Sequence, residues 1–174
     1  MTTWTAPAAQ RKDEPFTGPE REMLQGWLDW HRQTLLTKCA GLTAEQLKTA
    51  SVEPSNLTLL GLVRHMTEVE RIWFVVRAAG LTPPGPLYNT EDNRDGDFDD
   101  VADADAEANL AAYHAELPAA DRAVADLPLD HEFTTHRGDR MTLRWVYLHM
   151  IEEYARHNGH ADLLRERIDG VTGD

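Results

Sequence analysis

Glu153 and His157 are the residues whose types and spacing point most directly to chemistry in this sequence. They are four residues apart in a segment with the apolar periodicity of a helix, so their side chains are predicted to lie one turn apart on one face. A carboxylate and an imidazole on an apolar face are costly to bury unless a partner satisfies both groups. One bound ion within reach of both side chains would be such a partner.

His65 shows the same anomaly in a second apolar segment. It follows Leu62 by three residues and precedes Val69 by four, on or beside the predicted apolar stripe. If the two helices face each other, His65 converges with Glu153 and His157. Two imidazoles and a carboxylate form a facial site for zinc or another divalent ion, with open positions for water or substrate.

Simpler interpretations of the three residues stay open at this point. His65 could be a core histidine with satisfied hydrogen bonds, and Glu153 with His157 could form an ion pair on a partly solvated face. A shared metal explains all three residues at once, since no other ionic partner is evident in the two stripes.

Four other residues are secondary candidates. His149 lies one turn before the carboxylate and could be a further ligand or support one, and His160 could contact substrate or hold a ligand in place. His31 could line the cleft or belong to the core. Cys39, near a helix end, is expected to pack against other residues rather than act as a nucleophile.

Four helical segments are expected to position these residues. The first follows an apparent capping box at Thr17–Glu20 and ends at Gly41, and the second runs from 55–58 to Gly80. The third spans roughly 103–126, with Pro118 expected to bend or divide it. The fourth runs from Leu143 to about Ile168, after a Thr142 cap and before Gly170. Its inward stripe is expected to contain Leu143, Val146, Met150, Glu153, His157, Ala161, Leu164 and Ile168.

The remaining segments are expected to connect these helices. Residues 1–16 are polar and are expected to be flexible, and residues 81–105 form an acidic surface connection. Thr43 can cap a short helical turn, and Arg137–Asp139 can form the turn of a short hairpin. The sequence therefore predicts an all-α four-helix bundle in one domain over residues 17–170.

Composition excludes several classes of function. The 174 residues carry 17 Lys and Arg against 30 Asp and Glu, a net charge of −13, which argues against nucleic acid and anionic membranes as partners. A single cysteine excludes a disulfide framework and suits a reducing compartment. Since the chain lacks a long apolar run, a cytoplasmic location is expected. No Glu-x-x-His motif of a di-iron site is present.

Two segments resemble the DinB/YfiT-like superfamily of metal-dependent enzymes. They are Leu62–Phe74, which contains His65, and Thr142–Glu166, which contains Glu153 and His157. The resemblance extends over most of the chain from about residue 20. It is closest to a DinB-like branch related to mycothiol-dependent transferases and maleylpyruvate isomerase.

The superfamily pattern is a histidine on the second helix and a pair spaced by four on the last helix. That pair is often two histidines, but it is Glu and His in mycothiol-dependent maleylpyruvate isomerase, as it is here in Glu153 and His157. Many relatives continue with Arg-Gly-Gln where this chain has Asn158-Gly159-His160. The role of His160 therefore stays open.

The resemblance implies an up-down-down-up bundle, frequently dimeric, with zinc or nickel in its cleft. It also implies activation of a low-molecular-weight thiol, most readily mycothiol, for transfer to an electrophile. Coordination favours the nucleophilic thiolate over the neutral thiol. The same metal could instead generate hydroxide for hydrolysis, and a non-catalytic helical dimer is a third hypothesis. A substrate pocket is expected to be lined by Trp73, Trp145 and Tyr154.

Overall fold

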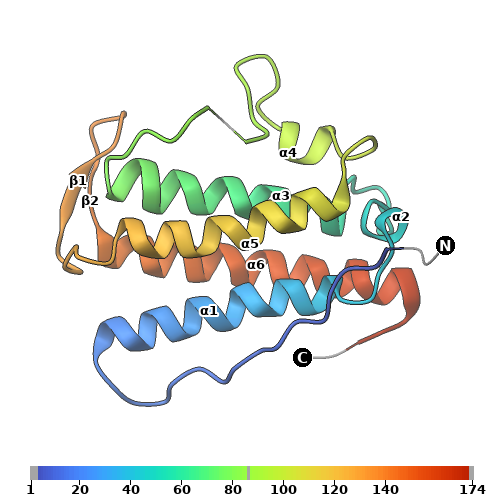
Figure 1. Cartoon of the computed structure of the whole chain (residues 1–174), viewed down its shortest axis with the longest axis horizontal. Coiled ribbons are helices and arrows are strands. Elements are labelled where there is room, and N and C mark those ends of the chain that lie inside the picture. The colour runs from blue at the N-terminus through green and yellow to red at the C-terminus, as the bar shows by residue number, and fades with distance from the viewer. Residues whose placement is uncertain (1–3, 86, 173–174) are drawn as a thin grey trace.

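The computed structural model describes residues 4–85 and 87–172, which are mainly helical (Figure 1). The helical elements are α1 (Glu20–Cys39), α2 (Ala44–Leu47), α3 (Leu59–Glu70), the π-helical segment η1 (Arg71–Ala78), α4 (Gly96–Asp99), α5 (Ala106–Ala123) and α6 (Leu143–Asp169). Two short strands, β1 (Glu132–Thr134) and β2 (Arg140–Thr142), form an antiparallel pair. The predicted helical class and the hairpin before the last helix are therefore confirmed.

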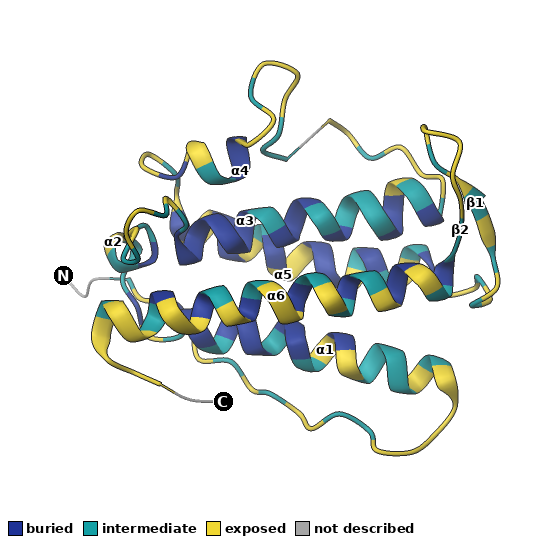
Figure 2. Ribbon diagram, turned by 180° about the vertical axis from the view of Figure 1, so that it is seen from behind, coloured by how far each residue is buried: buried dark blue, intermediate teal, exposed yellow. Residues whose placement is uncertain are grey.

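Four long helical segments lie side by side. Figure 1 shows α1 and α6 running in one direction, while α3 with η1 and α5 run in the other. The closest neighbours are α1 with α6 and α3 with α5, and α3 also contacts α6. Buried positions face inward between these segments and exposed positions lie on their outer faces (Figure 2). Among the described residues, no helix is both long and apolar enough to cross a bilayer.

Local capping explains where most helices begin and end. The Thr142 hydroxyl accepts a hydrogen bond from the Trp145 amide, and Gly170 adopts a left-handed conformation with φ 77° that ends α6. Thr58 caps α3 in the same way. Thr43 forms a capping box with Gln46 at α2, so the predicted short turn is confirmed.

The expected capping box at Thr17–Glu20 is wrong. Helix α1 begins at Glu20, directly after Pro19, and its N-cap has no side-chain hydrogen bond. The Glu20 carboxylate instead pairs with Arg144 of α6, with 2.7 Å between Nε and Oε1. This long-range ion pair competes with the local cap that the sequence pattern suggests.

Two predicted helix bodies differ in detail from the structure. The second continues without interruption to Ala78, but from Arg71 it is wound as a π-helix. The third is shorter than expected because Asp105 is its cap, accepting a hydrogen bond from Ala108. Pro118 lies inside α5 without dividing it.

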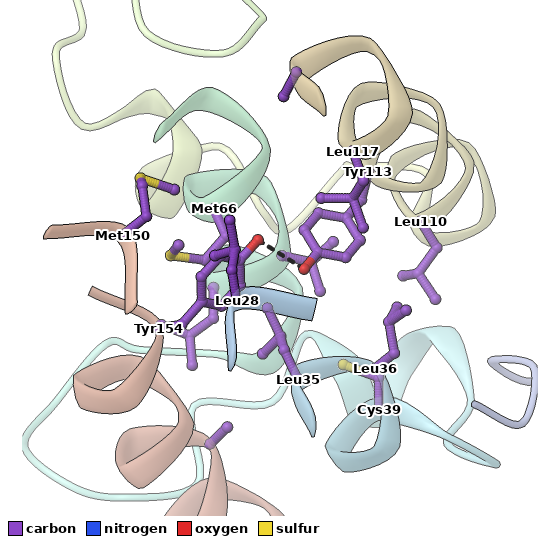
Figure 3. Packing of buried hydrophobic residues seen from close by; sticks show 14 of the residues in the cluster. Leu28, Leu35, Leu36, Cys39, Met66, Leu110, Tyr113, Leu117, Met150 and Tyr154 are labelled. Atoms are coloured by element: carbon purple, nitrogen blue, oxygen red, sulfur yellow. Dashed lines mark hydrogen bonds between the residues drawn. The ribbon is translucent and has the colours of Figure 1, made fainter. Parts of the chain in front are cut away.

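The core lies where the four long segments meet. Figure 3 shows Leu28 and Leu35 of α1 close to Met66 of α3, with Tyr113 of α5 and Tyr154 of α6 beside them. All five are completely buried. A Leu, Met or Tyr side chain removed from water in this way contributes roughly 1.5–3 kcal/mol of hydrophobic stabilisation.

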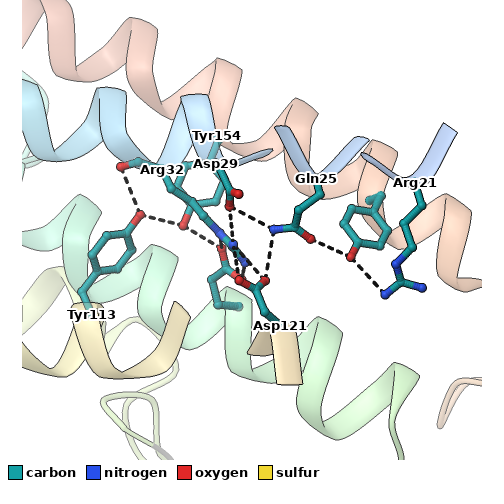
Figure 4. Close-up of polar contacts among 9 residues, drawn as sticks. Arg21, Gln25, Asp29, Arg32, Tyr113, Asp121 and Tyr154 are labelled. Atoms are coloured by element: carbon teal, nitrogen blue, oxygen red, sulfur yellow. Dashed lines mark hydrogen bonds and ion pairs between the residues drawn. The ribbon is translucent and has the colours of Figure 1, made fainter. Parts of the chain in front are cut away.

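A buried ionic network crosses this core (Figure 4). The guanidinium of Arg32 makes two 2.7 Å hydrogen bonds to the carboxylate of Glu70. Tyr154 donates to Glu70 at 2.9 Å and its hydroxyl lies 2.8 Å from that of Tyr113, while Asp121 also pairs with Arg32. The network connects α1, α3, α5 and α6 and so restricts how each helix is rotated about its axis.

Residues 4–16 run in an extended conformation along α1. Ala6 is buried, exchanging backbone hydrogen bonds with Leu42 and Gly41, and Thr5 pairs with Thr43. The guanidinium of Arg11 stacks on an indole of α1. These contacts anchor part of the segment for which the sequence predicts flexibility.

Candidate metal centre

The structure brings His65, Glu153 and His157 together between α3 and α6. Each residue offers one donor atom, and the three atoms lie within 4.8 Å of one another. The rings of His65 and His157 have centroids 4.8 Å apart, and His157 Nε2 lies 3.5 Å from Glu153 Oε2. The predicted convergence of these side chains is therefore observed, while metal binding by them remains a prediction.

The inward stripe predicted for α6 is partly wrong. Its apolar members Leu143, Val146, Met150, Ala161 and Leu164 are buried, but Tyr154 and Asn158 occupy the buried positions at the level of the site. Glu153 and His157 lie one position aside, with 18% and 12% of their side chains exposed. The buried hydroxyl of Tyr154 donates a hydrogen bond to Glu70, so the face of α6 that carries Tyr154 points toward the core. The site therefore borders solvent.

Asp97 orients His65. Its Oδ2 lies 2.7 Å from Nδ1 of His65, and the residue is only 2% exposed. A carboxylate accepts hydrogen bonds, so Nδ1 carries the proton and Nε2 is left with its lone pair. A carboxylate behind a histidine in this way is the usual support for a metal ligand.

Asp97 also corrects the prediction for residues 81–105. That connection is not wholly a surface segment, because α4 folds back against α3 and buries Asp97. Arg64 donates to the backbone carbonyl of Asp97 at 2.9 Å, and Asn89 accepts from its backbone amide. Phe98 of the same turn stacks on the His65 ring at 4.9 Å.

His157 is supported by a second imidazole. Its Nδ1 lies 3.4 Å from Nδ1 of His160, a distance at which one ring must donate and the other accept. Burial lowers the pKa of His157 to about 4, and the neighbouring imidazoles of His65 and His160 act in the same direction. His157 is therefore neutral near pH 7, as a metal ligand must be.

A comparison with known proteins identifies the family. A family model described as mycothiol-S-transferase matches residues 23–170, which include the three candidate ligands. The chain belongs to the mycothiol-S-transferase family. This family lies within the DinB-like superfamily, so the resemblance seen in the sequence is confirmed. No curated protein and no solved structure matches the chain.

The donor set of this mycothiol-S-transferase family member fits a divalent ion. Two imidazole nitrogens and one carboxylate suit zinc and the neighbouring transition metals, and three protein ligands leave positions open. The support of His65 by Asp97 gives an independent reason for the fit. A second group of donor atoms, from His149, Glu152 and Glu153, shares the same carboxylate.

The other sequence candidates occupy different surroundings. His149 Nε2 lies 3.6 Å from Glu153 Oε1, and its ring contacts the indole rings of Trp73 and Trp145, which also contact each other. His31 is away from the centre, on the α1 side of α6, where the Asn158 amide donates to its carbonyl at 3.1 Å.

Of the remaining expectations for side chains, that for Cys39 holds and that for Tyr154 is wrong. Burial raises the pKa of the Cys39 thiol to about 12, which agrees with a packing role. Glu152 is exposed and pairs with Arg156. Tyr154 does not line a substrate surface, because it is fully buried and bonded to Glu70.

Proposed function

We propose that the protein transfers mycothiol to a carbon electrophile, with a divalent cation held by His65, Glu153 and His157. The observation that carries this proposal is the grouping of the three donor atoms within 4.8 Å, with a buried carboxylate behind His65. Membership of the mycothiol-S-transferase family supplies the thiol. Zinc suits the donors best and nickel is the second choice.

A divalent cation at this site would lower the pKa of a coordinated thiol from about 8.5, so that the reactive thiolate predominates at neutral pH. His65 presents Nε2 because its Nδ1–H donates a hydrogen bond to the Asp97 carboxylate. His157 is neutral because burial lowers its pKa to about 4. Glu153 contributes negative charge that balances part of the charge of the cation.

The transfer step itself is a nucleophilic displacement. The thiol proton passes to solvent, the sulfur–carbon bond forms, and the bond from carbon to the leaving group breaks with its electron pair on the leaving group. For a chlorodinitrobenzene the products are the thioether and chloride. Glu153 and His157 project from successive turns on one face of α6, so the helix fixes their spacing during this step.

Finer statements on architecture, location and partners belong to the same proposal. The helices form an up-down-down-up four-helix bundle within a single domain of residues 17–170, and the protein is a cytoplasmic homodimer. The running directions of the long helices support the first statement (Figure 1). The substrates of the protein are a small-molecule thiol and a small-molecule electrophile, and neither nucleic acid nor a membrane is a partner.

The proposal is tested with protein purified without a histidine tag. We expect about one divalent ion per chain and formation of a mycothiol thioether from a chlorodinitrobenzene, faster than with cysteine or glutathione. A matched control is His114→Ala, which removes an exposed imidazole from α5. Hydrolysis of an ester without any thiol would favour the hydrolase, and absence of metal and turnover would favour the non-catalytic dimer.

A further inference from the structure

A continuous row of contacts leads from the candidate metal centre to Arg77 of η1. Glu153 lies 3.6 Å from His149, whose ring lies 4.5 Å from that of Trp73. The guanidinium carbon of Arg77 lies 4.0 Å from the centre of the Trp73 ring. The Trp145 ring stacks on that of His149, with ring centroids 4.8 Å apart and planes inclined by 17°. We refer to Trp73, His149 and Trp145 as the aromatic wall.

The aromatic wall offers unsaturated surface beside the site, with the Trp73 ring inclined by 65° to that of His149 and by 49° to that of Trp145. The two indoles approach within 5.2 Å, and Trp145 is 39% exposed. Large aromatic rings exposed to water are favourable surfaces for other planar, electron-poor rings. Since the thiol sulfur is assigned to the cation, the exposed part of this wall, which contacts Glu153 through His149, is available to the second substrate.

Arg77 supplies positive charge at the far end of the wall. Within residues 4–85 and 87–172 it forms no ion pair, in contrast to Arg32, Arg71 and Arg144, each of which contacts a carboxylate. Partial burial lowers the pKa of Arg77, and the nearby positive charge of Arg137 acts in the same direction. A guanidinium without a carboxylate partner gains from an incoming anion, because the two groups form charge-assisted hydrogen bonds.

We propose, on the basis of the function proposed above, that the electrophile is a planar compound bearing a carboxylate or similar anionic group. Its ring packs on the aromatic wall and its anionic group pairs with Arg77. This orientation directs the reactive carbon toward the cation held by Glu153. Arg77 is thus a specificity-determining residue, and Trp73 and Trp145 bind the body of the substrate.

The binding part of the test uses unreactive probes and needs no turnover. Calorimetric titration compares dinitrobenzoate with dinitrobenzamide, which has a similar shape but no charge. We expect the wild-type protein to bind the benzoate about tenfold more tightly, the size of one charge-assisted hydrogen bond. Arg77→Gln is expected to lose this preference, while Arg94→Gln, which removes the same charge from an exposed loop, is expected to keep it. Equal binding of both probes, or a preference kept by Arg77→Gln, overturns the inference.

The kinetic part compares a chlorodinitrobenzene with a chlorodinitrobenzoate, using mycothiol as the nucleophile. Arg77→Gln is expected to lower kcat/KM for the benzoate about tenfold more than for the neutral compound. Equal losses for both compounds contradict the assignment of the anionic group to Arg77. If the charged probe binds as expected but neither compound reacts, the anion site stands and the proposed thiol transfer fails.

Discussion

Asp97 and His65 form a 2.7 Å hydrogen bond across 32 residues of sequence, between a carboxylate of α4 and Nδ1 of an imidazole of α3. This bond fixes the ring of the candidate ligand before any cation is bound. It also ties a short acidic turn to the site, which the pattern of the sequence alone does not suggest.

Replacing Asp97 is expected to weaken metal binding without removing a ligand. In Asp97→Asn a neutral amide oxygen replaces the charged oxygen that accepts the hydrogen bond from His65 Nδ1. We therefore expect the affinity for zinc to fall about 10- to 100-fold. Competition with a chromophoric chelator measures the change. Asp99→Asn, at an exposed position of the same turn, is the control and is expected to keep the wild-type affinity. Equal affinities for the two variants would show that Asp97 does not support a metal ligand.

Removing the charge of Arg32 is expected to destabilise the fold. Arg32→Leu leaves the carboxylate of Glu70 buried without its bidentate partner, and the loss of unfolding free energy is expected to be about 3–5 kcal/mol. Urea denaturation measures this loss. The double variant Arg32→Leu/Glu70→Leu is expected to recover much of it, because no charge is then stranded. A loss below about 1 kcal/mol in the single variant, as for an exposed pair, would contradict the buried network.

Two leucines test the packing that brings α3 and α6 together. Leu62 and Leu164 are 0% and 2% exposed, so truncating either to Ala is expected to cost about 2–5 kcal/mol in the free energy of unfolding. Val76→Ala, at a position that is 42% exposed, is the control and is expected to cost about 0.5 kcal/mol or less. If both leucine variants unfold like the control, the faces of the two helices are assigned wrongly.

Cys39 is expected to be unreactive in the folded protein. Burial raises the pKa of its thiol to about 12, so the reactive thiolate is scarce at pH 8, whereas an unfolded cysteine ionises near pH 8.5, about its ordinary value. Iodoacetamide should therefore modify the protein slowly at pH 8 and much faster in urea, as followed by mass spectrometry. Rapid modification without urea would show that the thiol is accessible.

The ends of α6 and the grouping of the candidate ligands could be predicted from the sequence. Thr142 and Gly170 are strong local signals, and the spacing of Glu153 and His157 needs only helical geometry to be read correctly. His65 follows from the same reasoning on α3. The ends of α6 and the position of each candidate ligand on its helix depend on neighbours within that helix, while the grouping also requires α3 and α6 to face each other, as they do.

The supporting residues could not be predicted in this way. Asp97 is one of many acids in its segment, and its burial depends on how α4 packs against α3. Arginine and glutamate are common at solvent-exposed helix positions, so the sequence gives no sign that Arg32 and Glu70 are buried. Their pairing arises only in the folded core. Tyr154 points inward in place of Glu153 and bonds to Glu70 of this pair, so the stripe predicted for α6 differs from the structure by one position at the level of the site.

The most direct measurement is a zinc titration of the metal-free protein in which bound metal and mycothiol thioether are followed together. We expect both to rise in parallel and to reach a plateau near one zinc per chain. His157→Ala is expected to lose at least about tenfold in affinity and to need correspondingly more zinc for turnover, while His114→Ala behaves as the wild type. Full thioether formation by the metal-free protein, or unchanged zinc binding by His157→Ala and Glu153→Ala, would contradict a metal-dependent transferase centred on these residues.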